Sequence, residues 1–207
     1  MLGRFFRSAE FLTSRVVLPP GHKLSPIERW KTEYYRRELQ TLPAKIEAWG
    51  RSINYRLFPS NTPQQVQELV TGLQALVYRL DQLQEVGDGR QGDHQGVHQT
   101  AAITQEMDKD VRAWLIGIAS IFGTWSEDPE LESATLLRER LKALLTRLDK
   151  RIGEALEQTN TAAIGDRRQQ GFYRLLAGAR GLSEATVAYA GVADTIDWAQ
   201  WHEEVFS

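Results

Sequence analysis

The stretch that decides the fold runs from Val66 to Leu83 and has the sequence VQELVTGLQALVYRLDQL. Its apolar residues recur at spacings of three and four, which places them on one face of a helix. They are Val66, Leu69, Leu73, Leu76, Val77, Leu80 and Leu83. A second stretch repeats this spacing through Leu137, Leu141, Leu144, Leu145, Leu148, Ile152 and Leu156. The sequence therefore predicts an all-α protein, an antiparallel helical bundle of about five to seven helices.

Helix-start signals divide the chain into its elements. Ser25-Pro26-Ile27-Glu28 combines a hydroxyl cap, a proline at the first helical position and a returning carboxylate, and Thr62-Pro63-Gln64-Gln65 repeats the arrangement. Asp128-Pro129 is a simpler start. The expected helices span 2–17, 26–58 with a bend or break at Pro43, 63–86, 99–124, 129–159, 167–193 and 197–205. Segment 87–98 holds four glycines and predicts a flexible surface loop.

Length and composition exclude several classes of protein. The chain has 207 residues, 42% of them hydrophobic, which is enough for one sizeable core. It has no cysteine, so disulfides, thiolate catalysis and cysteine-ligated metals are excluded. No apolar run approaches the roughly 18 residues of a membrane span, and arginines interrupt any signal-peptide core.

Charge is unevenly distributed along the chain. The net charge is −2, which argues against a nucleic acid partner bound by phosphate neutralisation. Residues 1–58, however, hold 11 Lys and Arg against 5 Asp and Glu, so the excess of acidic residues falls in the remainder. This asymmetry indicates either an end that faces an anionic surface or two regions that neutralise each other across the bundle.

The N-terminal residues 1–18 form a basic amphipathic helix that we treat as a separate, juxtamembrane-like segment, followed by a bundle domain over 19–207. Its membrane-facing candidates are Leu2, Arg4, Phe5, Phe6, Arg7, Leu12, Arg15 and Val16. In such a helix the apolar residues enter the headgroup region of a bilayer while the arginines meet phosphates. A first helix that docks on its own bundle has the same pattern, so both interpretations stay open.

Aromatic and basic residues alternate in the second expected helix. The aromatic residues are Trp30, Tyr34, Tyr35, Trp49, Tyr55 and Phe58, and the cations are Arg29, Lys31, Arg36, Arg37, Arg51 and Arg56. Such residues could stack single-stranded bases. The favoured interpretation is that they are core anchors packed beneath arginine stems.

The sequence carries no catalytic or cofactor motif. None of the four histidines follows a glutamate by three residues, so a di-iron bundle site is excluded. Asp93, His94 and His98 lie in the glycine-rich segment, where their spacing has no helical meaning. Glu106 and Asp110 share a helix face but have Lys109 and Arg112 beside them, which is typical of a solvated face. We therefore expect no enzyme, no cofactor and no metal site.

Small residues distinguish the expected helix 167–193. Gly178, Gly181 and Ala185 leave little side chain on part of its surface, so a neighbouring backbone can approach closely. Tight packing inside the bundle is the favoured explanation, and a homo-oligomer formed through these three residues is the alternative.

Four strings of the sequence resemble one known family. They are Phe11-Leu12-Thr13-Ser14-Arg15-Val16-Val17-Leu18-Pro19, Arg29-Trp30-Lys31-Thr32-Glu33-Tyr34-Tyr35-Arg36, Trp49-Gly50-Arg51-Ser52-Ile53-Asn54-Tyr55-Arg56-Leu57-Phe58-Pro59 and Ile196-Asp197-Trp198-Ala199-Gln200-Trp201-His202-Glu203-Glu204. Together they resemble the C-terminal cytoplasmic part of cyanobacterial FUSC-family proteins, which are fusaric acid resistance-like or aromatic acid exporter-like membrane proteins. The resemblance covers nearly the whole chain but carries no site motif.

The resemblance implies a cytoplasmic helical domain at the inner face of a membrane, with an assembly, gating or regulatory role in an efflux protein. Its partner would be the transmembrane bundle of the transporter or the membrane surface. The spanning segments of that family are missing from this sequence, so we expect either a fragment or a free-standing relative. The alternative function is a free-standing helical protein-interaction module.

Overall fold

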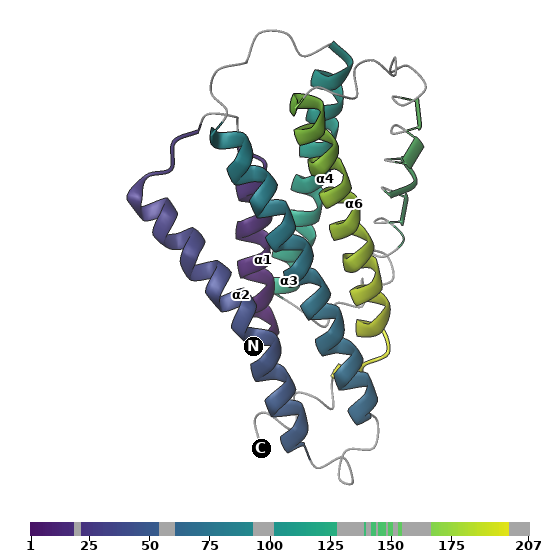
Figure 1. Ribbon diagram of the computed structural model, residues 1–207. Helices are drawn as coiled ribbons and strands as arrows, with labels where there is room; N and C mark the ends of the chain where they lie inside the picture. The colour runs from purple at the N-terminus through teal and green to yellow at the C-terminus, as the bar shows by residue number, and fades with distance from the viewer. Residues whose placement is uncertain are drawn as a thin grey trace.

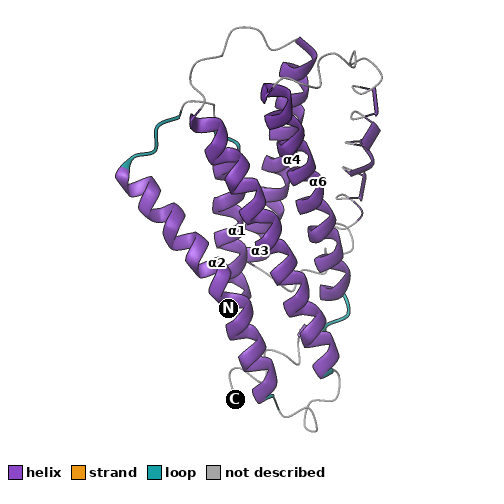
Figure 2. Cartoon of the chain, viewed as in Figure 1, coloured by secondary structure: helices purple, strands orange, loops and turns teal. Residues whose placement is uncertain are grey.

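The computed structural model describes residues 1–18, 22–53, 61–92, 102–127 and 167–198, together with ten isolated positions between 139 and 154. The protein is all-α, as the periodicity predicts, and no strand occurs in these ranges. Its helices are α1 (Leu2–Val16), α2 (Pro26–Ser52), α3 (Pro63–Gly92), α4 (Ala102–Glu127) and α6 (Arg167–Ala193). Figure 2 shows these helices and the described loops that connect them.

The helices form a bundle in which α1 packs mainly on α4, and α3 packs mainly on α6. Helix α2 covers α1 and α3 from outside, while smaller contacts join α1 to α3 and α4 to α6. In Figure 1, α2 lies at one side of the bundle, and its N-terminal end diverges from the other helices. The buried residues of α2 are Leu39, Leu42, Pro43, Ile46 and Gly50, all in its second half.

An aromatic cluster fills the core where α1, α4 and α6 meet. The Phe6 ring lies 5.1 Å from Trp125, 5.2 Å from Tyr189 and 5.9 Å from Phe122, measured between ring centroids. Burial raises the pKa of the Tyr189 hydroxyl far above its ordinary value. Helix α1 is thus a central element of the bundle.

Close approach and capping fix α1 against α4. A Cβ on Gly3 would lie 2.7 Å from the Ser126 carbonyl oxygen, so only glycine allows the two backbones to meet there. At the other end, the Arg112 guanidinium donates to the carbonyl oxygens of Val17 and Leu18 at 2.8 and 2.9 Å. These carbonyls lack partners within a helix end, and a cation there also complements the helix dipole. The separate N-terminal segment expected for residues 1–18 is therefore part of the bundle core.

Both capping predictions within the described ranges are confirmed. The Ser25 hydroxyl accepts from the Glu28 amide at 3.2 Å, and the Ser25 amide donates to Glu28 Oε2 at 2.8 Å. Thr62 and Gln65 make the same reciprocal pair at the start of α3. The third predicted start, Asp128-Pro129, lies outside the described residues.

One expected break and part of one expected loop are absent from the described helices. Helix α2 is continuous through Pro43, because Leu39, Leu42 and Ile46 on both sides of the proline pack into the core and offset the hydrogen bond that proline removes. The break at Pro43 is therefore wrong, and the bend stays a prediction. Helix α3 extends to Gly92, so the predicted loop begins too early. Each glycine costs a helix only about 1 kcal/mol relative to alanine, and extension of a long existing helix needs no new nucleation step, so these glycines do not by themselves end α3. Residues 93–98 of the predicted loop lie outside the described residues.

The remaining boundaries agree closely with expectation. Helix α6 has the predicted bounds, and α4 extends three residues beyond its expected end. All ten described positions between 139 and 154 are helical, in line with the helix predicted over 129–159. Of the short helix expected at 197–205, Trp198 is helical and residues 199–205 lie outside the described ranges.

The chain ends of α3 and α6 are tied together by side-chain amides. Asn61 Nδ2 donates to the Asp197 carbonyl, and the Asp197 amide donates to Asn61 Oδ1, both at 2.9 Å. Gln65 Nε2 donates to the Thr195 carbonyl at 2.6 Å. These bonds satisfy backbone groups that the end of α6 would otherwise leave without partners.

Candidate functional site

The described residues contain no group of three or more His, Asp or Glu side chains arranged to hold a metal ion. His94, His98 and Asp93 lie outside the described ranges. Glu106 is in α4, although its side chain is not described, and Asp110 is exposed on the same helix. The remaining candidate sites in the described ranges are exposed helix faces.

The structure places the membrane-facing candidates of α1 in two different environments. Its apolar members Leu2, Phe5, Phe6 and Leu12 are buried in the core, and Val16 packs against it. The candidate membrane face of α1 is thus covered by the bundle, and of the two open interpretations the structure favours docking.

The arginines of α1 lie on the opposite side of that helix. Arg4 pairs with Glu38 of α2, and Arg15 lies 3.6 Å from Glu28 of the same helix. Arg7 is exposed. The cationic side of α1 therefore faces α2 and the solvent beside it.

The oligomer-face candidates of α6 serve packing within the chain. A Cβ on Gly178 would lie 3.1 Å from the Leu83 side chain, and one on Gly181 would lie 3.1 Å from the Arg79 guanidinium. Ala185 is half-buried against the core. These small residues let α3 and α6 approach closely, which supports packing within the chain, and the homo-oligomer alternative stays a prediction.

The first half of α2 carries the largest exposed apolar side chains that lie together. Ile27 is 68% exposed, Trp30 65% and Tyr34 43%. Their spacing of three and four residues places them in one stripe, with Lys31 between them on the same helix side. We call Ile27, Trp30, Lys31 and Tyr34 the α2 outer face.

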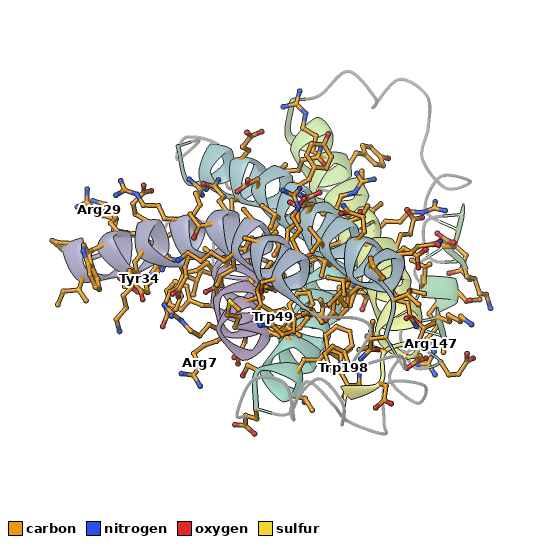
Figure 3. All side chains as sticks on the ribbon, turned by 90° about the horizontal axis from the view of Figure 1, so that it is seen from below. Arg7, Arg29, Tyr34, Trp49, Arg147 and Trp198 are labelled. Carbon is orange, nitrogen blue, oxygen red and sulfur yellow. The ribbon has the colours of Figure 1, made fainter. Side chains whose placement is uncertain are left out.

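This face points away from the core. Leu39, Leu42 and Ile46 define the buried side in the second half of α2. At 100° per residue Trp30 lies about 120–180° around the helix from them, whereas Ile27 and Tyr34 lie about 60–140° from them. The stripe is exposed also because the first half of α2 diverges from the other helices, as Figure 1 shows. Figure 3, seen from below, shows α2 extending beyond the other helices, with Tyr34 and Arg7 of α1 on one edge and Arg29 on the other.

Ring stacking orders the α2 outer face. The Trp30 and Tyr34 rings stack with centroids 5.6 Å apart, and Tyr34 meets Tyr35 edge-on at 5.3 Å. Tyr35 in turn lies 4.6 Å from Phe11 of α1. The Tyr34 hydroxyl donates to Glu38 Oε1 at 3.5 Å, and Glu38 also pairs with Arg4. The exposed rings are therefore held by contacts that lead back to α1.

Charges around the face are predominantly positive. Lys31 and Arg7 form no ion pair with any residue that the structure describes. The acidic groups nearby are already engaged, since Glu33 pairs with Arg37 at 2.8 Å and Glu28 caps the helix. The outer face thus combines exposed apolar area with uncompensated cations.

The carboxylate that begins α2 is held in its ionised form. Hydrogen bonds from the backbone amide and the side chain of Ser25, assisted by His22, lower the pKa of Glu28 to about 2. A carboxylate at a helix start also complements the helix dipole. The position of the outer face therefore depends on an anion that persists well below neutral pH.

The prediction that the aromatic residues of the second expected helix are core anchors is confirmed for some of them and wrong for others. Tyr35 packs on the core and Trp49 is half-buried, whereas Trp30 and Tyr34 are exposed. Tyr55 and Phe58 lie outside the described residues. The signal that could have separated them is the wheel position, because Trp30 and Tyr34 do not share the side of Leu39, Leu42 and Ile46.

Comparison with protein families, with curated proteins and with solved structures gives no match to this chain. Among the described residues, no helix combines the length and apolar content needed to cross a bilayer.

Proposed function

We propose that this chain is a non-catalytic helical docking domain, whose bundle holds the α2 outer face against a larger assembly. The observation that carries the proposal is the exposed stripe of Ile27, Trp30 and Tyr34 in the first half of α2, which precedes the core contacts of that helix. Single exposed apolar residues are ordinary, but three large ones in a stripe on one helix are typical of an interaction site.

Order within the stripe supports the same proposal. The stacked Trp30 and Tyr34 rings lose little further freedom on binding, so the entropy cost of association is small. The pair of Tyr35 with Phe11 connects this ordered region to the core. The bundle then serves as a rigid support for one helix face.

The proposed setting follows the resemblance to FUSC-family domains. That resemblance supports a place in the cytoplasm, at the inner face of a membrane, and an assembly, gating or regulatory role in an efflux protein. The excess of positive charge in residues 1–58 suits such a position, because the cytoplasmic leaflet is negatively charged.

The second candidate function is a free-standing module that binds a partner protein through the same face. The observation that favours it is residue type, since Trp and Tyr carry much of the binding energy at protein interfaces.

In-cell photocrosslinking tests the docking function without assuming the partner. A benzophenone amino acid replaces Trp30 in the full chain, and a matched control carries it at Tyr78, which is 59% exposed on α3. We expect a discrete crosslinked product from position 30 and little from position 78. Equal yields at the two positions, or none at position 30, would contradict the proposal.

A further inference from the structure

The residues of the α2 outer face are arranged so that one flat surface can contact all of them. Ile27 and Tyr34 are seven residues apart, which places the stripe along about 10 Å of helix. The N-terminal end of α2 diverges from the bundle in Figure 1 and extends beyond it in Figure 3. A flat surface can therefore contact the stripe along its length.

The side chains of the stripe suit the boundary between water and hydrocarbon. Trp and Tyr combine an apolar ring with a polar group and are enriched at the headgroup level of bilayers. Ile27 supplies an apolar side chain at the end of the stripe, where α2 begins. A helix with such residues on one side lies in the plane of the interface.

Charge complementarity identifies the type of bilayer. Lys31 lies within the stripe and Arg7 lies on the adjacent exposed side of α1, and neither has an ion-pair partner among the described residues. Arg4 of α1 is already compensated by Glu38 beside Tyr34, so the charges left for an external partner are those of Lys31 and Arg7. Lipid phosphates would compensate these charges.

We infer that the α2 outer face docks on an anionic bilayer, with Ile27, Trp30 and Tyr34 in the headgroup region and Lys31 and Arg7 against lipid phosphates. The inference rests on the proposed docking function and names its partner. It also assigns membrane contact to α2 in place of α1, whose apolar side is occupied by the core.

Cosedimentation of the intact chain with vesicles tests the apolar part of this site. The chain should bind vesicles of phosphatidylglycerol mixed with phosphatidylcholine and bind phosphatidylcholine vesicles much less. The Trp30→Ala/Tyr34→Ala variant should lose at least about tenfold in partition coefficient, because both ring anchors are removed. The Tyr78→Ala/Ile116→Ala control removes two equally exposed residues from α3 and α4 and should bind within about twofold of the unsubstituted chain.

A matched pair of cation variants tests the electrostatic part. Lys31→Gln should weaken binding about fivefold, the factor expected for one cation close to an anionic membrane. Arg29→Gln removes the same charge from another side of α2 and should have a smaller effect, since Figure 3 places Arg29 on the opposite edge from Tyr34. Equal effects of the two substitutions would overturn the proposed orientation.

The outcomes separate this inference from the docking function on which it rests. Undiminished vesicle binding by the Trp30→Ala/Tyr34→Ala variant, or no preference for anionic vesicles, overturns the bilayer inference. If vesicle binding is absent while position 30 crosslinks to a protein in cells, the bilayer inference fails and the docking function stands. If position 30 gives no crosslink to lipid or protein, both fail.

Discussion

Helix α1 and the first half of α2 are both basic amphipathic helices, yet the apolar stripe of α1 is buried and that of α2 is exposed. The stripe of α1 is buried through Phe5, Phe6 and Leu12, where α1 packs on α4 and α3 and where Phe6 meets Tyr189 of α6. The stripe of α2 stays in solvent through Ile27, Trp30 and Tyr34. Amphipathicity thus establishes that a helix has an apolar side, and only the neighbouring helices decide what covers it.

The two helices also differ in how their apolar residues are arranged around the helix axis. In α2 the apolar residues change sides along the helix, so that Leu39, Leu42 and Ile46 bind the bundle while the earlier stripe faces away. In α1 the buried Leu2, Phe5, Phe6 and Leu12 share one side, and Phe11 on another side packs against Tyr35 of α2. A helix with two apolar sides in succession can be anchored by one and present the other.

The largest expected effect concerns the buried stripe. Phe6→Ala should lower the free energy of unfolding by about 3–5 kcal/mol, because it leaves a cavity among Phe122, Trp125 and Tyr189. Chemical denaturation followed by circular dichroism measures the change. A loss below about 1 kcal/mol would show that α1 is not docked in solution. The apolar stripes of α1 and α2 would then not differ in burial.

A smaller loss is expected where α1 crosses α4. Gly3→Ala should destabilise the protein by about 1–3 kcal/mol, since the new Cβ would come within 2.7 Å of the Ser126 carbonyl oxygen. Gly117→Ala is the matched control, because a Cβ there meets nothing within 4 Å. That control should raise stability by up to about 1 kcal/mol through helix propensity, and thermal denaturation compares the two. A neutral Gly3→Ala would argue against the close approach.

The capping box that starts α2 supplies a third, intermediate effect. Ser25→Ala should cost about 1 kcal/mol and raise the pKa of Glu28 above about 2 but only part of the way to 4.5, because the backbone amide of residue 25, the largest cause of the lowered pKa, is kept. Because the folded pKa lies below the unfolded one, the stability contributed by ionised Glu28 is present above pH 4.5 and is lost as pH falls toward 2. An NMR titration of the Glu28 carboxyl carbon checks the shift, and an unchanged pKa in the Ser25→Ala variant would contradict the contribution assigned to the Ser25 side chain.

The smallest expected effect on folding falls on the exposed stripe. Trp30→Ala should change the free energy of unfolding by no more than about 0.5 kcal/mol, because 65% of the residue surface is already in solvent. The same denaturation experiment as for Phe6→Ala gives the measurement. A loss of several kcal/mol would mean that Trp30 is a core residue, and the α2 outer face would then not exist.

Local signals in the sequence predicted much of this fold. The bounds of α6 and the reciprocal caps at Ser25 and Thr62 follow from residues within a few positions of one another. The loop predicted from the glycines of 87–92 is wrong for these six residues, because an existing helix extends through them without a new nucleation step. Local signals are reliable where the interacting residues are close in sequence.

The candidate site and the long-range bonds could not be predicted in the same way. Arg112 caps α1 from α4, and Asn61 ties α3 to the segment after α6, although no motif marks either residue. The exposure of Trp30 depends on α2 leaving the bundle, which is set by how α1 and α3 pack beneath its second half. Such features arise from the summed packing of several helices.

The bond from Arg112 to the end of α1 also bears on the synthesis of the protein. The two residues joined, Val17 and Arg112, are 95 positions apart, so α1 leaves the ribosome long before its main partner α4. At about 5 to 20 residues per second, translation of that interval takes roughly 5 to 20 s. During this time the Phe5 and Phe6 side of α1 has no α4 to cover it, and the nascent chain presents an apolar helix that the finished bundle conceals.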